Sequence, residues 1–143
     1  MASIVDSAAA VRSGERSAVD GIDDALRAAE ALQPRLNAFT SIDRQGAIAR
    51  AQELDRRIEK GEDVGPLAGI PIGLKDLIDQ SGIPNTNGAA FDPVVPETSA
   101  TVVDRLEAAG AEGTAGSSPM AIRCSSSKIR LPYSGNMVSF RCG

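Results

Sequence analysis

The sequence predicts an α/β fold that is rich in helix. Four segments carry apolar residues at helical spacing. Before the last of them, Ile70, Ile72 and Leu74 alternate with small or cyclic residues, which is typical of a short and mostly buried strand. Helices that alternate with strands favour packing of helices on a sheet. The 143 residues are enough for one modest domain.

The first two helices are predicted from their ends. The first begins at Ser3, an N-cap candidate, and stops at Gly14. The second begins near Ser17, and Asp20 occupies the position, three residues on, where a capping box has Glu or Gln. We expect this helix to end at Pro34. Its apolar stripe comprises Val19, Ile22, Leu26, Ala29 and Leu32.

The third helix is predicted from Asp43 to Lys60, after a short extended piece over 38–42. Gly61 is the expected C-terminal cap of this helix. Basic residues in the last turn of the helix interact favourably with the negative end of its dipole. Its apolar positions are Ala47, Ala51, Leu54 and Ile58.

The segment 80–96 is rich in Gly, Pro and Asn and is predicted to be a loop. The fourth helix is expected to begin near Thr98 or Ser99, to run to Ala109 and to end at Gly110. The residues expected to face inward are Val102, Val103, Leu106 and Ala109.

Composition excludes several classes of function. The net charge is −4, so the composition does not indicate a basic surface for nucleic acid. The chain has no Trp and only four Phe or Tyr residues, so base stacking is not expected either. No stretch approaches the ~20 apolar residues that span a bilayer, and the N-terminus lacks the pattern of a secretory signal. Cys124 and Cys142 form no metal-binding spacing. We expect a cytoplasmic protein.

Lys75 is the best candidate for acid–base chemistry. The chain has no histidine, which excludes Ser-His-Asp and Cys-His relays and zinc sites built on imidazole. Lys75 ends the apolar strand, where burial would favour the neutral amine, and a neutral amine is a general base. The alternative is an ordinary lysine that is solvated or paired with Asp76 or Asp79.

The composition changes near residue 113. All 19 acidic residues lie at or before Glu112, together with 11 basic residues, whereas four basic residues and no acidic ones follow. We detect no helix pattern or convincing strand run after residue 113. Two interpretations stay open, a flexible Ser-rich basic tail and a segment foreign to the original protein, such as the product of a reading-frame change. We favour the second, because a helix-to-strand unit is cut off after Ala111.

Residues 1–112 resemble the N-terminal part of the amidase signature family. The block PLAGIPIGLKDLID, residues 66–79, is similar to the segment that holds the family's catalytic lysine. The segments 35–43 and 81–111 resemble its flanking parts. The resemblance implies a fragment of an α/β fold in which helices cover a mixed sheet. It leaves 113–143 as an aberrant Ser-rich basic tail, disordered or non-homologous.

The resemblance also implies a function and one site residue. Family members hydrolyse carboxamides with two serines and a lysine, without a metal or an organic cofactor, and the lysine corresponds to Lys75. In the family the two serines lie further along the chain, in and after a Gly/Ser-rich segment. Gly116-Ser117-Ser118 and Ser125-Ser126-Ser127 lack the flanking glycines of that segment, so we expect ordinary solvated serines there.

We therefore expect an amidase-type hydrolase of small-molecule amides that is truncated and inactive alone. The alternatives are the A-type component of an amidotransferase, which serves glutamine-dependent tRNA amidation, and a non-catalytic truncated paralogue or interaction module. Because helices that normally pack on further strands lack those strands, we also expect marginal stability.

Overall fold

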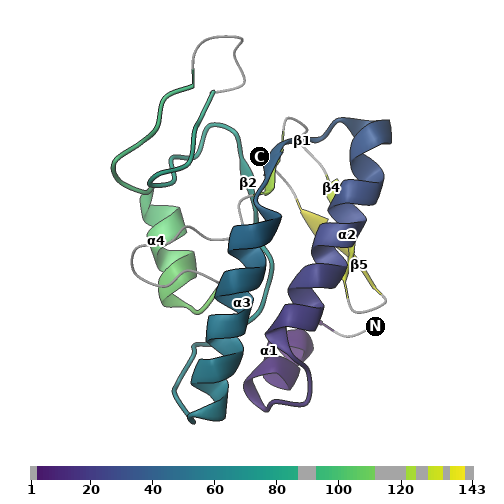
Figure 1. Ribbon diagram of the computed structural model, residues 1–143, viewed down its shortest axis with the longest axis vertical. Coiled ribbons are helices and arrows are strands. Elements are labelled where there is room, and N and C mark those ends of the chain that lie inside the picture. The colour runs from purple at the N-terminus through teal and green to yellow at the C-terminus, as the bar shows by residue number, and fades with distance from the viewer. Residues whose placement is uncertain (1–2, 87–92, 112–121, 125–128, 134–135, 141–143) are drawn as a thin grey trace.

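The computed structural model describes residues 3–86, 93–111, 122–124, 129–133 and 136–140. Figure 1 shows the arrangement of the helices and strands within these residues. The helices are α1 (Ile4–Arg12), α2 (Ala18–Leu36), α3 (Arg44–Glu59) and α4 (Thr101–Ala108). The strands are β1 (Phe39–Ile42), β2 (Gly73–Lys75), β3 (Ile122–Cys124), β4 (Ile129–Tyr133) and β5 (Asn136–Phe140).

The core lies where α2 and α3 pack side by side and run in opposite directions, with β1 at their shared end (Figure 1). Ile22, Leu26 and Ala29 of the predicted stripe are fully buried, and Val19 and Leu32 pack against the core partly buried. From α3, the predicted positions Ala47, Ala51 and Leu54 are buried, with Ile58 at the margin. The helical spacing therefore predicted both inward faces correctly.

Side-chain caps start the first two helices where the sequence predicted. Ser3 and Asp6 form a complete capping box, with Asp6 N–H donating to Ser3 Oγ at 3.1 Å and Ser3 N–H donating to Asp6 Oδ2 at 2.8 Å. The N–H of Ser3 holds the pKa of Asp6 below its ordinary value. At α2, Ser17 Oγ accepts the Asp20 N–H at 3.4 Å.

A carboxylate from α3 completes the cap of α2. Asp55 accepts hydrogen bonds from Ser17 Oγ at 2.7 Å, from Ala18 N–H at 2.7 Å and from Val19 N–H at 3.2 Å. A helix N-terminus leaves N–H groups without intrahelical acceptors and favours a nearby negative charge. Asp55 therefore joins the two central helices by charge and by hydrogen bonds as well as by packing.

The predicted end of the second helix at Pro34 is wrong, because α2 continues to Leu36. Proline removes only one N–H donor, and near a helix end this loss interrupts the ladder briefly. The helix ends at Asn37, which adopts the left-handed conformation at φ 43° and donates its N–H to Gln33 O at 2.8 Å. Asparagine tolerates this conformation better than most residues do.

Gln33 also fixes the start of β1. Its Nε2 donates to Phe39 O at 2.7 Å, and its Oε1 accepts the Phe39 N–H at 3.0 Å. Both main-chain polar groups of Phe39 are thus bound by one side chain. The chain turns from α2 into β1 with its direction set by this pair of bonds.

The expectation that no strand run follows residue 113 is wrong. Strand β3 lies between β1 and β2, antiparallel to β1 and parallel to β2, which makes a mixed three-stranded sheet. Strands β4 and β5 form a separate antiparallel pair. Pairing with partners on both sides allows a short segment with a weak local pattern to be a strand. The division of the chain at residue 112 stays a prediction.

The fourth helix differs from its prediction at its start. It begins at Thr101, after the N-cap Ala100, and not near Thr98 or Ser99. Val103 is fully buried as expected, but Val102 is 49% exposed. An eight-residue helix has a narrow inward face, so adjacent apolar residues cannot both be buried.

A close backbone contact joins the end of α4 to the segment that leads into β2. Gly110 has φ +85°, and a Cβ built there would lie 1.8 Å from Val64 O. Next to this contact, Leu67 N–H donates to Ala109 O at 2.8 Å. The contact requires glycine at position 110, because a side chain would overlap the carbonyl oxygen.

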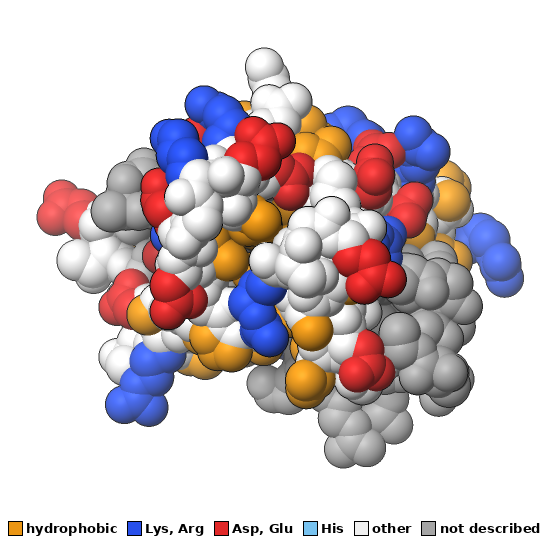
Figure 2. Space-filling model, turned by 90° about the horizontal axis from the view of Figure 1, so that it is seen from below, with side chains coloured by type: hydrophobic (Ala, Val, Ile, Leu, Met, Phe, Trp, Pro, Cys, Tyr) orange, Lys and Arg blue, Asp and Glu red, His pale blue; other side chains and the backbone are white. Residues whose placement is uncertain are grey.

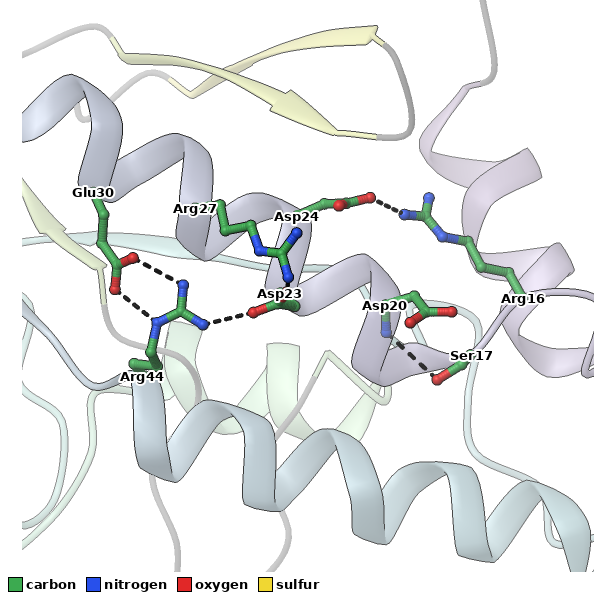
Figure 3. Close-up of polar contacts among 8 residues, drawn as sticks. All are labelled: Arg16, Ser17, Asp20, Asp23, Asp24, Arg27, Glu30 and Arg44. Atoms are coloured by element: carbon green, nitrogen blue, oxygen red, sulfur yellow. Dashed lines mark hydrogen bonds and ion pairs between the residues drawn. The ribbon is translucent and has the colours of Figure 1, made fainter.

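Ion pairs on the outer side connect the start of α3 with α2 (Figure 3). Arg44 Nε donates to Glu30 at 2.7 Å and Nη1 donates to Asp23 at 2.5 Å. The hydrogen bond from Arg44 holds the pKa of Glu30 below its ordinary value. Glu30 is 45% exposed, so solvent screens much of this interaction.

Candidate active site

Lys75 lies at the end of β2, as predicted, although the strand is shorter than the apolar run suggested. Only Gly73–Lys75 forms β2, because residues 66–69 make a turn and residues 70–72 have no regular structure. Lys75 is half-buried and lies opposite Cys124 in the parallel pairing with β3. Leu74 is 3% exposed, so the strand before the lysine is packed inside the molecule.

The chain turns sharply after Lys75. The carbonyl oxygen of Lys75 accepts the N–H of Leu77 at 2.8 Å and the N–H of Ile78 at 3.0 Å. The turn keeps Asp76 and Asp79 near the end of the strand. Both residues were the expected partners of an ordinary, ion-paired lysine.

Asp76 is engaged by Thr86 instead. Asp76 as a residue is 1% exposed, its Oδ1 accepts the Thr86 N–H at 3.2 Å and its Oδ2 accepts the Thr86 hydroxyl. A buried carboxylate requires hydrogen-bond donors to replace water. Thr86 supplies two of them from ten residues along the chain.

Asp79, which is exposed, is engaged by Asn85 through one side-chain hydrogen bond. Asn85 Nδ2 donates to Asp79 Oδ1 at 2.8 Å, and Asn85 is 1% exposed. The main chain of Asn85 pairs with Val94 in both directions, at 2.8 and 2.9 Å, and this bridge crosses the predicted loop. Asp79 O in turn accepts the Ala100 N–H at 2.9 Å, which ties the site to the start of α4.

Within the residues that the structure describes, the Lys75 side chain has no ion pair. The two nearest carboxylates along the chain are bound elsewhere. Sequence reasoning missed Asn85 and Thr86, because a polar pair inside a Gly- and Pro-rich loop carries no periodic signal. The acids at 76 and 79 were the only signal that buried donors should exist nearby.

The predicted serine clusters at 117–118 and 125–127 lie outside the described residues. In the described part, no group of three or more Cys, Asp or Glu side chains is placed to hold a metal ion. None of the described helices has the length and apolar character needed to cross a membrane.

Two further surfaces lie away from Lys75. A groove of about 670 Å³ runs between α2 and α3, and none of its lining residues comes from β2 or the loop after it. Figure 2 shows acidic and basic side chains interspersed on the lower end of the molecule. A mixed surface of this kind does not favour a polyanion there.

Comparisons with known proteins agree with the family resemblance of residues 1–112. The family model described as Amidase matches residues 20–121. The A component of the glutamyl-tRNA(Gln) amidotransferase of Streptomyces coelicolor is 43% identical over 103 residues, which cover 71% of this chain and 21% of that protein.

Solved structures show the same similarity. A crystal structure of an amidase matches with a TM-score of 0.68 and 30% identity over 82% of this chain and 26% of that one. The native peptide amidase from Stenotrophomonas maltophilia matches with a TM-score of 0.67 and 27% identity, over 85% of this chain and 23% of that one.

The chain spans about a fifth of the length of the curated relative and about a quarter of each solved chain. The α/β class predicted from the sequence is confirmed by these structures. Because the family model covers well over half of its residues, this chain belongs to the amidase family, the amidase signature family that its lysine block resembles.

Proposed function

We propose that this chain carries the lysine base of an enzyme that hydrolyses amide carbon–nitrogen bonds. The observation that supports this is the half-buried Lys75, which has no ion pair in the described part of the chain and lies next to two carboxylates that Thr86 and Asn85 bind. A lysine without a carboxylate partner loses its proton more readily than a paired one. Family membership supports the reaction class.

In the proposed mechanism, the neutral amine of Lys75 accepts a proton that an intermediate serine relays from the nucleophilic serine. The nucleophile attacks the amide carbonyl, and the C–N bond breaks as the nitrogen takes up a proton that returns from Lys75. Water then hydrolyses the acyl-serine. The resemblance places both serines after the segment matched here.

A chimera tests the role of Lys75. Residues 20–111 would replace the matching segment of the Streptomyces coelicolor protein, and ammonia release from glutamine would be measured. We expect activity that falls by about 10²- to 10⁴-fold in Lys75→Ala, the range for a lost general base, and that stays unchanged in Lys60→Ala. An active chimera in which Lys75→Ala keeps its rate within a factor of about two contradicts the proposal.

The chain itself is tested by fluorophosphonate labelling. We expect no label, because the tail after residue 112 lacks the Gly/Ser-rich segment. Label that disappears in Lys75→Ala would show that the tail supplies a working nucleophile.

The second candidate is the A component of an amidotransferase. It is favoured by the 43% identity to a protein of that name, against 30% to the solved amidase. The same chimera distinguishes the two when glutamyl-tRNA(Gln) amidation is measured with the remaining components of the amidotransferase. Amidation supports the amidotransferase role, and hydrolysis of glutamine without amidation supports a free amidase.

A further inference from the structure

We propose that Thr86 and Asn85 are positioning residues that keep Lys75 free of an ion pair by binding the two carboxylates next to it. The inference rests on the proposed role of Lys75 as a base. The juxtaposition that carries it is the pairing of Asp76 with Thr86 and of Asp79 with Asn85.

Thr86 holds the carboxylate of the buried Asp76, whereas Asp79 is exposed. Each oxygen of Asp76 accepts one hydrogen bond from Thr86, one from the main chain and one from the hydroxyl. Removal of the hydroxyl takes one hydrogen-bond donor away from the carboxylate of a residue that is only 1% exposed. The nearest cation along the chain is the ammonium of Lys75, on a flexible four-carbon stem.

Asn85 is itself held rigidly. Its main-chain N–H donates to Val94 O, and its carbonyl oxygen accepts the Val94 N–H. The carbonyl oxygen of Asp79 accepts the N–H of Ala100 at the start of α4. The amide nitrogen of Asn85 is therefore a fixed donor to Asp79. An amide donor binds a carboxylate without adding a charge, so the site gains a hydrogen bond and no competing cation.

The separation matters for chemistry. A carboxylate beside an ammonium stabilises its charged form, and a charged ammonium cannot accept a proton. Asp76 follows Lys75 directly, and Asp79 follows after the tight turn. Binding by neutral donors lets the two carboxylates connect this turn to residues 85 and 86 while the lysine stays available as a base.

Competitive amine labelling of the full chain tests this inference. The chain has three lysines, and exposed Lys60 at the end of α3 serves as the internal reference. Acetic anhydride at limiting concentration and mass spectrometry of peptides give the labelling rate of Lys75 relative to Lys60. In Thr86→Val, we expect this ratio to fall about two- to fivefold, the size of a gained ion pair at a partly exposed site.

Two further variants separate ion pairing from loosening of the loop. Thr86→Ser keeps the hydroxyl and should label like the parent chain. Thr86→Val combined with Asp76→Asn removes the competing charge and should restore the parent ratio. A loop that is only loosened would expose Lys75 and raise its labelling in every variant, which overturns the inference.

An unchanged ratio in Thr86→Val, or a double variant as slow as the single one, also overturns it. Circular dichroism identifies a variant that does not fold, and Asn85→Ala then provides the same test at Asp79. The labelling ratio does not depend on turnover. A negative labelling result overturns the role of Thr86 and Asn85 and leaves the base role of Lys75 intact. A chimera that stays active with Lys75→Ala refutes the base role and does not bear on the labelling result.

Discussion

Replacement of Gly110 by alanine should weaken the connection that leads into β2 and Lys75. At φ +85° an L-residue is strained by roughly 1–2 kcal/mol, and the reduced entropy of the unfolded chain offsets about 0.4–1 kcal/mol of this. The new Cβ would lie 1.8 Å from Val64 O, so the two segments must separate. Separation breaks the bond from Leu67 N–H to Ala109 O, worth about 0.5–1.5 kcal/mol.

The expected loss is about 2 kcal/mol or more in the free energy of unfolding, because displaced packing adds to these values. Gly14→Ala is the matched control, since Gly14 has φ +73° and nothing within 4 Å of a built Cβ. It should lose only about 1 kcal/mol, the strain less the entropy gain.

Urea unfolding followed by circular dichroism, near the temperature of maximum stability, measures both losses. Hydrogen exchange at the Leu67 amide gives a local readout, and exchange there should be faster in Gly110→Ala than in Gly14→Ala. Equal losses in the two variants, with unchanged exchange at Leu67, would refute the claim that the Val64 contact requires glycine.

The other predictions concern charges. Asp55→Ala should destabilise the fold by about 2–4 kcal/mol, because the charged group that accepts three hydrogen bonds at the start of α2 is lost. Asp55→Asn should lose less stability, and chemical denaturation measures both variants. An alanine variant as stable as the parent chain would contradict the capping role. Burial, and secondarily Asp104, raises the pKa of Glu107 above its ordinary value of 4.5, although Arg50 opposes this. The folded state thus binds this proton more tightly, so the contribution of Glu107 to stability falls as pH rises above 4.5. Glu107→Gln should stabilise the chain at neutral pH and not below pH ~4, as denaturation at several pH values will show.

The parts of the fold that depend on local chemistry were predictable. Ser3, Ser17 and Asp43 start their helices because each side chain bonds an N–H three residues on, and such bonds lie within a short stretch of sequence. Gly61 likewise follows the end of α3 at φ +73°. The buried stripe of α2 follows from its spacing alone.

The parts that depend on distant partners were not. Asp55 caps a helix that begins far earlier in the chain, because it lies 38 residues after Ser17, and no pattern within α3 marks it as a cap. Strand β3 exists through pairing with β1 and β2, so its three residues carry little signal of their own. Lys75 was predicted from its strand and motif, whereas the partners of the acids beside it lie in a loop that only the tertiary structure brings near.

The side chain of Gln33 has a consequence for association between molecules. A strand whose N–H and C=O groups face outward unpaired can recruit a foreign strand, and proteins protect such positions. Phe39 gives its donor and its acceptor to Gln33, so neither is left to template an added strand. A single glutamine amide therefore occupies both polar groups at the first position of this outer strand and removes that position as a point where a foreign strand could pair.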